Sequence, residues 1–253
     1  MRTASAVLIG LALMLALVRL PSSEPQKPSL GSCVECHRRS QGISYLQHNL
    51  QDWEDSAHAK FGITCQACHG GDPSAAEKGK AHAGMLPSTD PASRVYYTAI
   101  PATCGSCHER EYKAFQRSAH YRELQNSGKG PNCVTCHGSM ANVVLTPSDL
   151  ERTCTICHRR PTLASATLLS LDNSSRALRR LNAEIEAARA KGIDVSQQEG
   201  ERRDAADLHV RSLEDWHTFK MQTVLQESQD VTKRAIDASN ELGLKQQDGT
   251  PKH

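Results

Sequence analysis

The sequence predicts a mainly α-helical protein with little regular structure in its first two thirds and a long helical hairpin at its C-terminal end. Three observations support this fold class. All ten cysteines lie before residue 159, aromatic residues make up only 4% of the chain, and apolar residues recur at helical spacing after residue 162. Because large apolar side chains are scarce, a conventional core in the cysteine-rich part would be thin.

Residues 1–29 form an export leader and a linker. An apolar run from Ala4 to Val18 follows a single Arg and precedes a polar stretch rich in proline. The run is shorter than the roughly 20 residues that a membrane-spanning helix needs, and no clear cleavage site follows it. The leader is therefore either a cleaved signal peptide or a retained membrane anchor. Both alternatives place the body of the protein outside the cytoplasm, in the periplasm or on the extracellular face of the cytoplasmic membrane.

Every cysteine belongs to a C-x-x-C-H motif, and the motif occurs five times, as "CVECH", "CQACH", "CGSCH", "CVTCH" and "CTICH". This motif attaches c-type haem. Two thiols on one helical turn form thioethers with the two vinyl groups of a porphyrin, and the following histidine binds the iron. Zinc ribbons and disulfides do not require a histidine after each pair. The predicted attachment residues are Cys33, Cys36, Cys65, Cys68, Cys104, Cys107, Cys133, Cys136, Cys154 and Cys157. The predicted proximal ligands are His37, His69, His108, His137 and His158.

Five covalently bound haems in residues 30–162 would leave roughly 25 residues for each, too few for a separate apolar core. We therefore expect stacked porphyrins to form the core of a pentahaem domain, with the chain wrapped around them. The net charge is +2 with acids and bases intermixed, which gives no sign of a nucleic-acid partner.

An internal repeat divides this domain into two two-haem modules, residues 33–70 and 104–138, followed by the fifth motif at 154–158. Each module contains a Ser-Ala-His phrase, "WEDSAHA" or "FQRSAHY", with an aromatic residue five positions before the histidine. We expect His58 and His120 to be distal ligands and the aromatic residue to pack on a porphyrin. The preferred pairing places each histidine on the first haem of its own module. In the alternative pairing, each caps the haem that follows it.

Other candidate distal ligands lack a repeated context. His82 either caps the second haem or is a solvated loop residue. His48 is a rival of His58, and His253 ends a polar tail and is expected to be free. Met140 follows "CHGS", so its thioether is either a sixth ligand of the fourth haem or a filler of space beside a porphyrin.

The C-terminal part, residues 163–253, carries no cysteine and reads as two helices. The first is expected over 168–191, where Gly192 ends it. The second is expected to run without interruption over 196–243, which gives an antiparallel hairpin.

Two further candidate ligands lie in the second of these helices. His209 and His217 are about 80° apart around a helix axis, so either can reach a haem. We expect His217 to cap the fifth haem, bound by Cys154 and Cys157, because no Ser-Ala-His phrase follows that motif. The hairpin is also a candidate interface for a homo-oligomer.

The motifs, the Ser-Ala-His phrases, "CHGG", "CHGS" and the long terminal helix resemble the multihaem cytochromes c of the cytochrome c554, pentahaem nitrite reductase and hydroxylamine oxidoreductase group. This resemblance implies a mostly α-helical fold around tightly stacked haems with mainly bis-histidine ligation. Three features depart from the group. The chain lacks the C-x-x-C-K motif that is usual in cytochrome nitrite reductases, and it has five haem motifs where hydroxylamine oxidoreductases have eight. Met140 stands where many relatives supply a histidine.

These features favour a cytochrome that carries single electrons between redox partner proteins, or from a quinol-oxidising complex, in an extracytoplasmic respiration of the anaerobic type. The preferred hypothesis is an electron-transfer protein rather than an enzyme. One alternative is a haem reductase of a nitrogen or sulfur oxyanion. Another is a membrane-anchored quinol dehydrogenase that resembles the NapC/NirT group.

Overall fold

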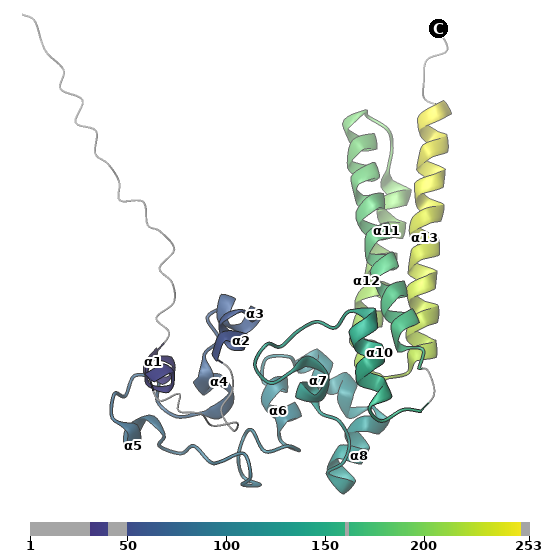
Figure 1. Cartoon of the computed structure of the whole chain (residues 1–253). Helices are drawn as coiled ribbons and strands as arrows, with labels where there is room; N and C mark the ends of the chain where they lie inside the picture. Colours follow the sequence, from purple (N-terminus) through teal and green to yellow (C-terminus); the bar gives the residue numbers. More distant parts are fainter. Residues whose placement is uncertain (1–30, 40–49, 160–161, 249–253) are drawn as a thin grey trace, which may run out of the picture.

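The computed structural model describes residues 31–39, 50–159 and 162–248. Every regular element in these ranges is a helix, which confirms the mainly α-helical prediction. The leader, His48 and His253 lie outside the described residues. The haem-motif part consists of short helices: α1 (Gly31–Arg39), α2 (Leu50–Glu54), α3 (Ala57–Lys60), α4 (Cys65–His69), α5 (Lys78–Ala81), α6 (Ile100–Gly105), α7 (Glu109–Gln116), α8 (Ala119–Ser127), α9 (Cys133–His137) and α10 (Pro147–Thr155). Figure 1 shows these helices in two groups, α1–α5 at one end and α6–α10 beside the long helices.

The second motif of each module forms a short helix of its own. Helices α4 and α9 contain "CQACH" and "CVTCH" from the first cysteine to the histidine. A glycine follows each helix, and Gly70 and Gly138 adopt φ values of +78° and +79°, a conformation that side chains disfavour. The glycine in "CHGG" and "CHGS" therefore turns the chain away directly after the proximal histidine.

The Ser-Ala-His phrase begins a helix in both modules. Ser56 accepts a hydrogen bond from the backbone N–H of Ala59, and Ser118 accepts one from Tyr121, so each serine is an N-cap. Both serines are buried. The histidine is then the second residue of a capped helix, and its position is fixed by the cap.

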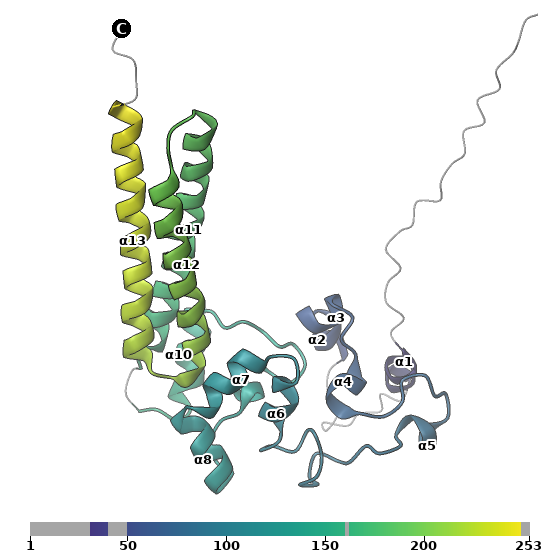
Figure 2. The ribbon, with the colours of Figure 1, turned by 180° about the vertical axis from the view of Figure 1, so that it is seen from behind.

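Three long helices make up the C-terminal part: α11 (Ala164–Ala190), α12 (Ser196–Asp215) and α13 (Met221–Asp248). Figure 2 shows them standing side by side as a bundle, and each contacts the other two. Their largest apolar cluster includes Leu181, Ile185 and Leu242. Gly192 ends α11 in a left-handed conformation, as predicted.

The prediction of one uninterrupted helix over 196–243 is wrong, because the helix is interrupted near its middle. A single 3₁₀ turn, η1 (Trp216–Thr218), follows α12, and Phe219 then adopts a left-handed conformation with φ of +59°. The Thr218 hydroxyl donates to the carbonyl of Asp215 at 2.7 Å and accepts from the N–H of Lys220 at 3.3 Å. A side-chain hydroxyl that bonds nearby backbone in this way competes with helix propagation. The hairpin is therefore a three-helix bundle, with its break packed against α7.

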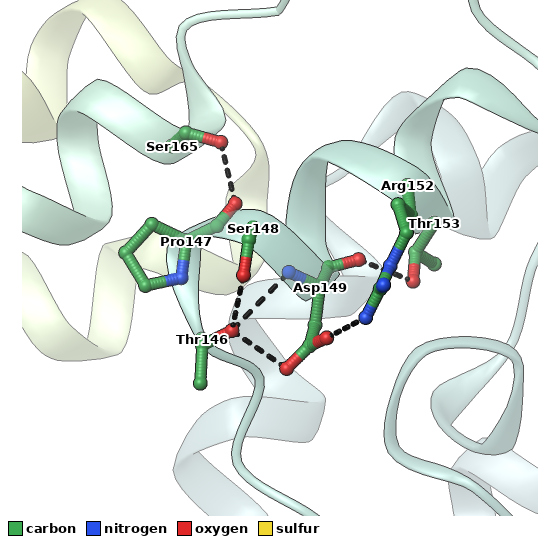
Figure 3. A network of polar contacts seen from close by, with 7 residues as sticks. All are labelled: Thr146, Pro147, Ser148, Asp149, Arg152, Thr153 and Ser165. Carbon is green, nitrogen blue, oxygen red and sulfur yellow. Dashed lines mark hydrogen bonds and ion pairs between the residues drawn. The ribbon is translucent and has the colours of Figure 1, made fainter.

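A polar network joins the fifth motif to the bundle (Figure 3). Thr146 caps α10 by accepting from the N–H of Asp149 at 3.2 Å, and its hydroxyl donates to the carboxylate of the same residue at 2.6 Å. Arg152 forms an ion pair with that carboxylate. Ser165, in α11, donates to the carbonyl of Pro147 at 2.9 Å, which ties α10 to the bundle.

Among the helices of the described residues, none is both long enough and apolar enough to cross a membrane.

Candidate haem-binding site

Four motif histidines each face a histidine from outside the motifs. The ring centres are 6.1 Å apart for His37 and His82, 6.1 Å for His58 and His108, 5.9 Å for His120 and His158, and 6.2 Å for His137 and His217. Metal–imidazole bonds are about 2.0–2.1 Å long, so a metal ion between two imidazoles sets their ring centres about 6 Å apart. The four pairs therefore have the spacing that bis-histidine haem ligation requires.

The two Ser-Ala-His histidines pair across module boundaries. His58 faces His108 of the third motif, and His120 faces His158 of the fifth. Both the preferred pairing, within a module, and its alternative, with the next haem along the chain, are therefore wrong. Each histidine skips one motif and meets the one after it. The linkers are long enough to reach several neighbouring motifs, so nearness in sequence does not fix the pairing.

The partners of the other two distal histidines also differ from expectation. His82 faces His37 of the first motif and not the second haem. His217 faces His137 of the fourth motif and not His158, because His120 already occupies the position opposite His158. An imidazole thus stands where Met140 was considered as the sixth ligand.

His209 does not join this set. It lies in α12 within the bundle, and its Nδ1 is 2.9 Å from the hydroxyl of Ser174 in α11. Among the described residues, no close ring contact links it to a motif histidine. The bundle thus brings one of its two candidate histidines to a motif and keeps the other between helices.

The cysteines of consecutive motifs lie next to one another within each module. The thiols of Cys33 and Cys65 interact electrostatically in the first module. In the second module, a hydrogen bond between the thiols of Cys104 and Cys133 raises the pKa of Cys133 and lowers that of Cys104. The same first-cysteine contact therefore recurs in both modules.

A second kind of contact joins one module to the next motif. The thiol of Cys68 interacts with those of Cys104 and Cys107, and Cys136 interacts in the same way with both cysteines of the fifth motif. The motifs thus follow one another in space in the order of the sequence. The two kinds of interaction alternate along the chain, in agreement with the two-haem repeat. The fifth motif therefore occupies the position that the first motif of a third module would have.

Hydrogen bonds orient three of the paired imidazoles and leave Nε2 for the iron. The Nδ1 of His58 donates to the side-chain oxygen of Asn142, that of His82 to the carbonyl of Lys78, and that of His137 to the carbonyl of Val143, each at 2.8 Å. Such bonds fix the tautomer and ring orientation of metal-binding histidines. Sequence reasoning missed Asn142, which lies 84 positions from His58; no local pattern marks that contact.

The imidazoles of His120 and His217 are held differently. The Nδ1 atoms of His120 and His217 are buried and have no hydrogen-bond partner among the described residues. Burial, with a smaller contribution from His137, lowers the pKa of His217 to about 4, and burial likewise lowers the pKa of His120. Both imidazoles are therefore neutral at pH 7, the form that can bind a metal.

Aromatic side chains enclose His120. The ring of Phe219 lies edge to face with it, 4.4 Å between centres, and also contacts Phe115 at 6.3 Å. Phe115 in turn contacts Tyr121 at 5.6 Å. The aromatic residue of the Ser-Ala-His phrase thus belongs to a cluster that covers the distal histidine. Sequence reasoning missed Phe219. The chain has so few aromatic residues that each of them could have been considered as a site residue.

Comparison with known proteins gives a match over the part of the chain that holds the third to fifth motifs. A family model described as cytochrome c7 and related cytochrome c matches residues 90–159, from before the third motif to just past the fifth. No curated protein matches the chain, and no solved structure does either. The match supports a multihaem c-type cytochrome with covalently bound haem c.

Proposed function

We propose that this chain is an exported pentahaem c-type cytochrome that passes single electrons between redox partners. The observation that carries the proposal is the order of the motifs in space. Thiols of the first and second motifs are near enough to interact electrostatically, and the same holds for each following pair up to the fifth, with a hydrogen bond between Cys104 and Cys133. Porphyrins attached to these thiols would form one continuous row.

The residues of the chain have separable roles in this proposal. The ten thiols would anchor the porphyrins, and the motif histidines would bind the irons. His58, His82, His120 and His217 would supply the second imidazole at four motifs. The bound haem supplies reversible one-electron chemistry. Ligation from both sides suits electron transfer rather than the binding of a substrate to iron.

The partners follow from the same arrangement. A protein that carries electrons along a row needs a donor at one end and an acceptor elsewhere. We infer that these are redox proteins or a quinol-oxidising complex outside the cytoplasm. The export leader and the requirement for haem attachment outside the cytoplasm support that location.

Electron paramagnetic resonance of the oxidised, haem-loaded protein tests the proposal. We expect low-spin ferric signals from at least four of the five haems, because a second imidazole faces the motif histidine at four motifs. A high-spin signal that amounts to one haem in five and that disappears when nitrite or sulfite is added would overturn the proposal in favour of an oxyanion reductase.

A further inference from the structure

The four distal histidines fall into two classes by the state of Nδ1. Those of the first and third motifs, His82 and His58, donate from Nδ1 to an oxygen acceptor. Those of the fourth and fifth motifs, His217 and His120, have a buried Nδ1 with no acceptor among the described residues. The classes also divide by position, since the unbonded pair lies against the C-terminal bundle.

We propose that the haems bound by His120 and His217 have higher reduction potentials than those bound by His58 and His82, so that electrons run toward the bundle. This inference rests on the proposed electron-transfer function.

The first physical reason is the strength of the ligand. An acceptor on Nδ1–H raises the basicity of an imidazole, because it draws the proton and adds electron density to the ring. A more basic ligand stabilises ferric iron, which carries one more positive charge than ferrous iron. The carbonyl oxygens on His58 and His82 therefore favour the oxidised state, and the bare Nδ1 of His120 and His217 favours the reduced state. At the fourth motif the bond from His137 to the carbonyl of Val143 opposes this effect, so the difference is clearest for the haem of His120.

The second reason is solvent exclusion. Burial in a medium of low polarity disfavours the more highly charged state of a redox centre, and the haem environment sets the potential in this way. The break between α12 and α13 supplies both His217 and Phe219, and Phe219 covers His120. His82, by contrast, is exposed to solvent at the far end of the row. Both effects act in the same direction.

The direction of flow follows from the order of the motifs. A one-electron donor of low potential would reduce the N-terminal end of the row. The electron would then pass motif by motif to the fourth and fifth positions, and an acceptor protein of higher potential would take it there. Each transfer oxidises one iron and reduces the next, so no further reactant is needed.

A potentiometric titration followed by electron paramagnetic resonance tests the assignment. In His58→Met and His120→Met, a thioether replaces one imidazole and raises the potential of the iron it binds. Each variant therefore identifies the reduction step of one haem. We expect His58→Met to move a low-potential step and His120→Met to move a high-potential step. If at least four wild-type haems are low-spin and the His58 step lies at or above the His120 step, this inference fails and the proposed function stands. If more than one wild-type haem is high-spin, the ligation of the four paired motifs is wrong and the proposed function itself fails.

Substitutions at Asn142 test the hydrogen bond separately. Asn142→Ala removes the acceptor and should raise the potential of the His58 haem, whereas Asn142→Asp offers a stronger acceptor and should lower it. Asn126→Ala, an exposed amide in α8, is the matched control and should shift no potential. A merely structural role would not move the potential in opposite directions. Equal shifts of one sign, or no shift, in both Asn142 variants would contradict the inference.

Discussion

Replacement of His217 by Ala should convert one haem in five to the high-spin state. His217 faces His137 with 6.2 Å between ring centres, and its side chain comes from a turn that no other histidine shares. Because the imidazole is buried, its loss leaves a space within the packed base of the bundle. The expected magnitude is one fifth of the total ferric iron, measured as the high-spin fraction in electron paramagnetic resonance.

His209→Ala is the matched control, since His209 lies in α12, eight residues before His217 in the adjoining turn η1. His209 bonds Ser174 and faces no motif. Its removal should leave the spin state of every haem unchanged and lower the free energy of unfolding by about 1 kcal/mol, the usual contribution of one hydrogen bond. A high-spin signal from the His209 variant, together with an unchanged spectrum for the His217 variant, would refute the assignment.

Two further predictions concern the helices that hold the site. Gly192→Ala should lower the free energy of unfolding by about 1–2 kcal/mol, because φ is +76° there. Gly243→Ala lies within α13, with nothing near the added methyl group, and should raise the free energy of unfolding by about 0.5–1 kcal/mol. Denaturant titration measures both changes, and shifts of the same sign would contradict the conformational argument. Ser118→Ala should lower the free energy of unfolding by about 1 kcal/mol, because it removes the cap of the helix that carries His120. The control is Ser127→Ala, at an exposed serine whose hydroxyl donates to the carbonyl of Glu123 in the last turn of the same helix. Equal decreases in the free energy of unfolding for the two variants would contradict a special role for the cap.

Sequence reasoning predicted local structure well where it depends on short spacings. The helical turns of the C-x-x-C-H motifs and the glycine after α11 depend on residues within one or two helical turns. The serine caps of the Ser-Ala-His helices are equally local, but sequence reasoning did not identify them. The helical character of the C-terminal part likewise follows from its apolar period. None of these features depends on contacts with segments that are distant in the sequence.

The pairing of histidines could not be predicted, because it depends on how distant segments pack. His58 reaches His108 with the help of Asn142, from a loop beyond the fourth motif, and Figure 1 shows that loop extending toward α3. His217 reaches the fourth motif only because the helix breaks at Phe219. The apolar pattern continues across the break and therefore predicted one helix, whereas the Thr218 hydroxyl bonds and the contact with α7 decide the actual conformation.

A coulometric reductive titration of the haem-loaded protein tests the central claim most directly. If all five motifs carry a haem and the haems form one connected row, each chain should take up five electrons, and the low-spin ferric signals should disappear completely. Uptake of four or fewer electrons per chain would contradict the account, because at least one motif would then carry no reducible haem.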